Sequence, residues 1–95
     1  MKDNEGQPQT TTEHHLKVWP AYWDAVKSGA KSFEVRRDDR GFQRGDVLVL
    51  RRWDTEGQRY MDDYEFAVRR RISYVLTGGQ FGIEAGYVVM GLQEP

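Results

Sequence analysis

Residues 20–37, "PAYWDAVKSGAKSFEVRR", change from a helical to a strand-like hydrophobic pattern within one short stretch. Pro20 suits the first position of a helix, and Gly29 suits the left-handed conformation that ends one. Apolar residues three or four positions apart form one helical face: Tyr22, Trp23 and Val26. The stretch therefore predicts a helix over residues 20–29.

The second half of the same stretch alternates. Phe33 and Val35 share one side of a predicted strand over residues 31–37, and Glu34 and Arg36 share the other. We expect Phe33 and Val35 to face the core, which leaves the two charged side chains facing solvent or a polar cleft.

Further strands are predicted on both sides of this unit, over residues 14–19, 46–53, 64–76 and 87–92, and a bulge in 64–76 would bend that strand. One helix among five or six mostly antiparallel strands predicts an α+β domain. So short a sheet is expected to curl into a small closed or nearly closed β-barrel that hides its edges. The expected inward-facing residues are Phe33, Val35, Val47, Leu48, Val49, Leu50, Val68, Ile72 and Val89.

Composition limits the alternatives. The 95 residues suffice for one domain, and the absence of cysteine excludes disulfides and thiolate metal sites. Residues 1–13 are polar and predict a disordered tail, so the expected domain is 14–95. No apolar run is long enough to span a membrane and no signal peptide is recognisable, so we expect a cytoplasmic protein with no membrane partner.

Charge is unevenly distributed. The chain has a net charge of −1, yet residues 17–71 hold 13 Lys or Arg against 10 Asp or Glu. The remainder holds one basic residue against five acidic ones, from the totals of 14 and 15. A mildly basic centre is compatible with a cleft for an anion.

Lys31, Glu34 and Arg36 are the strongest candidates for such a cleft. Glu34 and Arg36 share one face of the predicted strand, and Lys31 lies at its start. Together the three side chains can donate and accept hydrogen bonds with a base edge or a phosphate. The alternative is an exposed ladder of ion pairs that contributes less than about 1 kcal/mol to stability.

The pattern G-x-K-x-x-E-x-R, met here from Gly29 to Arg36, resembles the signature of ASCH domains in the PUA-like superfamily. The resemblance extends over residues 14–92 through an upstream H-x-L-K, a D-R-x-F-x-x-G-D loop and a final G-Y-V-V strand. The sequence of this region is similar to a compact bacterial and phage subfamily of unknown function. The resemblance implies a PUA-like pseudobarrel with a cleft that binds RNA or a nucleotide. Its implied site residues are Lys31, Glu34 and Arg36, with His14, Lys17, Asp39, Arg40 and Phe42 from the flanking motifs, and Asp46 matches the end of the loop motif.

Two enzymatic alternatives follow from the same resemblance. Some ASCH-like proteins are similar to amidohydrolases that act on N4-acylated cytidine, but these have a Thr where this chain has Glu34, and Ser32 has the wrong parity to replace it. Others resemble ribonucleases, in which Glu34 would be the general base and Lys31 and Arg36 would stabilise the phosphorane. A third alternative is a phage or plasmid accessory protein with a protein partner.

No metal or cofactor is expected, because the adjacent His14 and His15 of a strand point to opposite faces. The aromatic residues Trp19, Tyr22 and Trp23 are expected to pack in the core. Phe42 can stack on a base or plug the end of the barrel. The segments "RRW" at 51–53 and "RRR" at 69–71, with Trp53 and Tyr74, suit phosphate contacts and base stacking, or are solvated strand faces.

Overall fold

The computed structural model describes residues 11–95, which form one mixed sheet and one α-helix. The strands are β1 (Glu13–Val18), β2 (Phe33–Arg37), β3 (Val47–Asp54), β4 (Arg59–Tyr60), β5 (Val68–Thr77) and β6 (Tyr87–Gln93). The helices are α1 (Pro20–Ser28) and a 3₁₀ turn, η1 (Tyr64–Phe66). The α+β class and the single main helix are therefore as predicted.

The α1 helix ends where its sequence predicts. Gly29 takes a φ of 89° and its N–H donates to the carbonyl of Val26, which closes the last turn in the left-handed conformation that glycine adopts without steric cost. Trp23 and Val26 are buried against the sheet, and the Trp23 indole donates to the Leu50 carbonyl at 3.0 Å. Tyr22 lies outside this buried face and is exposed.

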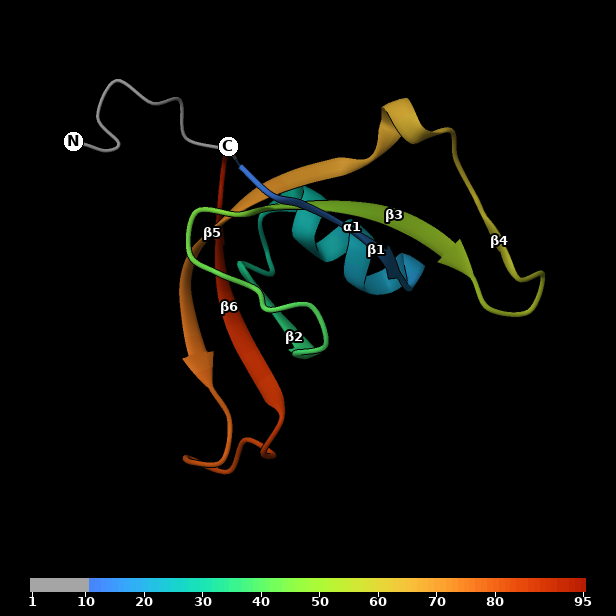
Figure 1. Ribbon diagram of the computed structural model, residues 1–95. Coiled ribbons are helices and arrows are strands. Elements are labelled where there is room, and N and C mark those ends of the chain that lie inside the picture. Colours follow the sequence, from blue (N-terminus) through green and yellow to red (C-terminus); the bar gives the residue numbers. More distant parts are fainter. Residues whose placement is uncertain (1–10) are drawn as a thin grey trace, which may run out of the picture.

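The sheet has the order β1-β3-β5-β6-β2, with β4 added to β3. The β1 strand runs parallel to β3, while the other pairings are antiparallel. The first part of β5 pairs with β3 and its later part with β6, and the register shifts between Ile72 and Tyr74. This irregularity bends the long strand, which Figure 1 shows as a curved orange ribbon linking the two halves of the sheet.

The core lies between α1 and one face of the curved sheet. It combines Trp23 and Val26 with residues of four strands and one loop: Leu16, Val18, Leu48, Leu50, Val68, Ile72, Val88, Met90 and Phe42. Within residues 11–95, β1 and β2 are the outermost strands of the sheet order. No helix in this part of the chain is both long and apolar enough to cross a membrane.

Three expectations need correction. Phe33 and Val35 are exposed and Glu34 is buried, so the predicted inward face of β2 was the wrong one. Residues 64–66 form η1 rather than the start of β5, because Ala67 N–H donates to the Tyr64 carbonyl in a 3₁₀ turn. The β1 strand begins at Glu13, inside the predicted tail. Residues 1–10 of that tail lie outside the described part of the chain.

Candidate functional site

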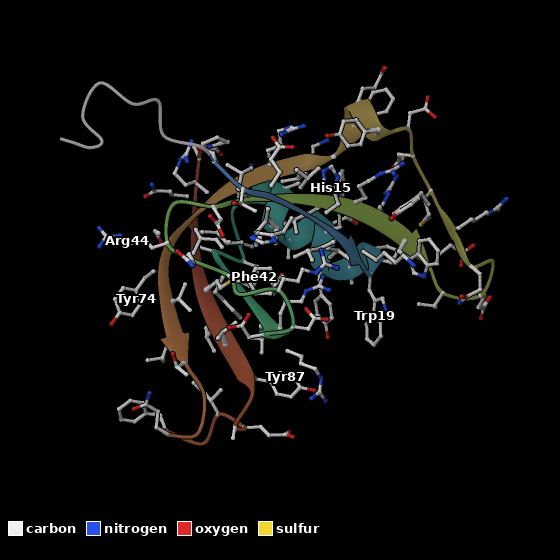
Figure 2. All side chains as sticks on the ribbon, viewed as in Figure 1. His15, Trp19, Phe42, Arg44, Tyr74 and Tyr87 are labelled. Atoms are coloured by element: carbon white, nitrogen blue, oxygen red, sulfur yellow. The ribbon has the colours of Figure 1, made fainter. Side chains whose placement is uncertain are left out.

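A cleft of about 640 Å³ opens where the first and last strands of the sheet order approach each other. One side comes from the end of β1 and the start of α1, and the other from β2 and the start of β6. Figure 2 shows the labelled side chains of Trp19 and Tyr87 projecting toward the space between these elements. The cleft is lined by Lys17, Val18, Trp19, Tyr22, Lys31, Phe33, Glu34, Val35, Arg36, Arg37 and Tyr87.

The three central motif residues meet at this cleft. The Glu34 side chain is only 6% exposed, and each of its oxygens accepts from a different cation. Lys31 Nζ donates to Oε1 at 3.0 Å, and Arg36 Nε donates to Oε2 at 2.8 Å. The carboxylate therefore fixes the positions of both cations, and a solvent-exposed ladder of ion pairs does not describe this group.

Arginine side chains also connect the two edges of the sheet. Arg36 Nη2 donates to the Lys17 carbonyl at 2.7 Å, and Arg40 Nη1 donates to the His15 carbonyl at 2.9 Å. An edge strand presents carbonyl groups that need donors. Here guanidinium groups from β2 and the following loop supply them in place of another strand.

Two aromatic rings line the cleft on the side formed by the end of β1 and the start of α1. Trp19 and Tyr22 stack with their centroids 5.9 Å apart and an interplanar angle of 18°, although they are 58% and 50% exposed. Lys31 Nζ lies 4.8 Å from the Phe33 ring and 5.7 Å from the Tyr22 ring. The prediction that Trp19 and Tyr22 pack in the core was wrong, because of the three aromatic residues only Trp23 is buried there.

The cleft is electrically asymmetric. Four basic residues line it (Lys17, Lys31, Arg36 and Arg37) together with one acid, Glu34. The difference is +3, in a chain whose net charge is −1. The site therefore favours an anionic ligand, and its rings offer flat apolar surfaces beside the charge.

The remaining predicted residues do not line this cleft. His14 is buried, with Nε2 2.8 Å from Asp46 Oδ2, and Phe42 packs against its ring at 4.7 Å. Phe42 thus fills the core, so it is not available for stacking in this conformation. Asp39 and Arg40 are exposed in the β2–β3 loop and lie 3.6 Å apart. In residues 11–95, no group of three His, Cys, Asp or Glu could hold a metal ion.

Sequence reasoning missed seven of the lining residues: Val18, Trp19, Tyr22, Phe33, Val35, Arg37 and Tyr87. No local pattern singles them out, since Tyr22 has the same helical spacing as Trp23 and Val26 and only the structure shows that it is exposed. The groups with shifted pKa values also lie elsewhere. Hydrogen bonding and proximity to Asp62 raise the pKa of Arg52, and the Arg52 guanidinium lowers the pKa of Asp62. A hydrogen bond to Glu13 raises the pKa of Arg69.

The fold and the cleft define a small α+β domain with a cationic cleft that aromatic side chains help to line. Residues 13–92 match a family described as a domain of unknown function, DUF3850, and the chain belongs to this family. A segment of 40 residues is 42% identical to an uncharacterized 12.9 kDa protein in the GpA 3' region of Escherichia phage P2. That segment covers 42% of this chain and 37% of the phage protein.

Proposed function

We propose that this chain is a PUA-like module of the ASCH type that binds RNA or a nucleotide in the cleft between β1 and β2. The observation that carries the proposal is the excess of cations beside exposed rings. Phosphate requires donors and positive charge, while a base requires a flat face. The cleft volume of about 640 Å³ also falls in the usual range of small-molecule sites.

In this proposal Lys31 and Arg36 bind a phosphate or a base edge. Lys31 Nζ already donates to the Phe33 carbonyl and to Glu34, which leaves one of its three N–H groups for a ligand. A base would lie against the Trp19 and Tyr22 pair. Glu34 is a positioning residue that holds the two cations at the mouth of the cleft.

The barrel-like closure of the fold belongs to the same proposal. The contacts of Arg36 and Arg40 with the carbonyls of β1 bring the two sheet edges together without a backbone ladder. A PUA-like pseudobarrel with its ligand cleft at this junction is consistent with both contacts.

The hydrolase alternatives receive less support from the geometry. A general base must have a lone pair directed at the proton that it removes. Both oxygens of Glu34 are already engaged by cations at 3.0 and 2.8 Å. We therefore assign Glu34 to positioning, and turnover becomes an outcome of the test.

The test is a titration with AMP, CMP, GMP and UMP and with short single-stranded RNA, in EDTA. Binding is monitored by tryptophan fluorescence. We expect binding that weakens with salt and no cleavage. Lys31→Ala should weaken binding about tenfold and lower the salt slope by about 0.7 through the loss of one phosphate contact. Arg44→Ala is the matched control, because Arg44 is exposed and lies away from Trp19 in Figure 2.

Two results would count against the proposal. If no nucleotide or RNA bound at low salt, the cleft would not be a nucleic-acid site. If RNA were cleaved and Glu34→Gln abolished cleavage while sparing affinity, Glu34 would be a catalytic residue and the protein an enzyme.

A further inference from the structure

A second surface begins where the cleft ends. It lies on the outer face of β1 and β3 and includes nearby rings from η1 and β4. We name it the aromatic-basic strip, and it consists of His15, Lys17, Arg51, Trp53, Tyr60 and Tyr64. Its side chains form a continuous series of contacts. Lys17 Nζ lies 4.0 Å from the Trp53 ring centre, Trp53 meets Tyr60 edge-on at 5.0 Å, and the Arg51 guanidinium lies 3.6 Å from the Tyr60 ring centre.

The chain of contacts continues to the other end of β1. Arg51 also lies 5.6 Å from the Tyr64 ring, and Tyr64 stacks on His15 at 5.5 Å with an interplanar angle of 22°. His15 and Lys17 have the same strand parity, and Lys17 is paired with Arg51 across the parallel ladder. Figure 2 shows His15 directed away from the side to which Trp19 projects.

Lys17 joins the strip to the cleft. It lines the cleft, where its carbonyl accepts from Arg36, and its ammonium group covers the Trp53 ring. A lysine has a flexible stem and a point charge. When a base stacks on Trp53, the Lys17 ammonium can therefore move from the ring to a neighbouring phosphate.

The strip contains three positively charged or titratable side chains and three rings, and none of its six members is acidic. Glu13 borders it, with one carboxylate oxygen accepting from Arg69 at 2.7 Å and the other 3.7 Å from His15 Nε2. The carboxylate of Asp62 is held by Arg52, so only its carbonyl reaches Arg51, at 3.1 Å. Alternating rings and cations along a groove are the arrangement by which proteins bind single strands, with bases on rings and phosphates on cations.

From these contacts we infer that the ligand is a single-stranded nucleic acid several nucleotides long, with one nucleotide in the cleft and its neighbours on the aromatic-basic strip. This inference rests on the proposed function and specifies its ligand class. From Lys17 to His15 the strand advances roughly 6.6 Å. Arg51 contacts both the Tyr60 ring and the Tyr64 ring, so the strip offers more than one ring to flanking bases.

The experiment measures fluorescence anisotropy with labelled oligouridylates of two, four, eight and twelve nucleotides, with the matching oligodeoxyuridylates in a parallel arm. The affinity of UMP is obtained by competition. We expect affinity to rise with length up to a plateau. Tyr64→Ala and Trp53→Ala should each lower the affinity of the eight-nucleotide strand about 5- to 100-fold and leave UMP binding unchanged, because stacking of one base is lost.

The matched control is Tyr74→Ala, since Tyr74 is an equally aromatic residue that is 62% exposed and lies on the other side of the molecule in Figure 2. Should Trp53→Ala fail to fold, Tyr64→Ala decides, because Tyr64 is 45% exposed on a short turn. Preference for RNA over DNA would show contact with the 2′-hydroxyl.

A length series that stays flat while UMP binds would overturn the strip and leave the cleft proposal intact. Absence of any nucleotide binding would overturn both. An acidic peptide of equal charge that bound as tightly as the eight-nucleotide strand, and lost affinity equally in Tyr64→Ala, would assign the strip to a protein partner and likewise overturn the inference.

Discussion

The buried carboxylate of Glu34 gives the clearest quantitative prediction. Glu34→Gln preserves the shape of the side chain but removes its charge. One charge-assisted hydrogen bond is lost, and an amide N–H is turned toward a cation that cannot accept it. Hydrogen bonds to charged groups contribute about 1.5–3 kcal/mol, and breaking a buried ion pair costs about 3–5 kcal/mol. Lys31 and Arg36 keep 18% and 27% exposure, so water compensates part of this loss.

We therefore expect Glu34→Gln to lower the free energy of unfolding by about 2–3 kcal/mol. In a domain of this size that corresponds to a fall in Tm of about 8–24 °C. Total stability is expected to be about 5–14 kcal/mol, so the variant should still fold. The assay is urea unfolding monitored by far-UV circular dichroism. Glu84→Gln is the control, because Glu84 is exposed in the β5–β6 loop.

A double-mutant cycle that combines Glu34→Gln with Lys31→Met measures the interaction energy between these two side chains. We expect a coupling energy of about 1–3 kcal/mol. If Glu34→Gln cost less than about 1 kcal/mol and the two substitutions were additive, the group would behave as an exposed ion pair, and the positioning role of Glu34 would be refuted.

Two further predictions concern parts of the fold away from the cleft. The Arg52 guanidinium holds the pKa of Asp62 below its ordinary value of 3.8, so this pair stabilises the fold above that pH and loses its effect as the pH falls through the folded-state pKa. Urea unfolding should show Asp62→Asn to be less stable than the parent at pH 7, with the difference vanishing in acid; a constant difference would exclude the linkage. Gly29→Ala should cost about 1 kcal/mol, because the φ of 89° strains an L-residue while no atom lies within 4 Å of the added Cβ. An unchanged midpoint in thermal unfolding would contradict this.

Local signals in the sequence account for the predicted elements that the structure confirms. Pro20 and Gly29 mark the ends of α1 because their backbone preferences act without tertiary context. The bend of β5 was also anticipated, and it lies between Ile72 and Tyr74. Lys31, Glu34 and Arg36, which the motif groups, line one cleft, and their short spacing in the sequence brings them together.

Parity alone could not decide which face of β2 is buried. Phe33 and Val35 look like core residues by composition, yet the core is filled from the other strands and from α1, and both side chains of β2 line the cleft instead. The same cause explains why Trp19 and Tyr22 were predicted to lie in the core although they line the cleft. A wall of exposed rings and a set of core rings have the same sequence composition, and only the packing of distant segments distinguishes them. The parallel pairing of β1 with β3 is likewise a long-range choice.

The position of the cleft follows from the way this sheet deals with its edges. An edge strand without a neighbour must satisfy its carbonyl groups, and β1 does so with the guanidinium groups of Arg36 and Arg40. Those cations need a counter-charge, which Glu34 supplies to Arg36 and at the same time to Lys31. Closing the gap with side chains instead of a ladder leaves a space lined by fixed cations. The contacts that hold the two edges together therefore also create the surface on which an anion can bind, and Arg36 serves both purposes through different nitrogens of one planar group.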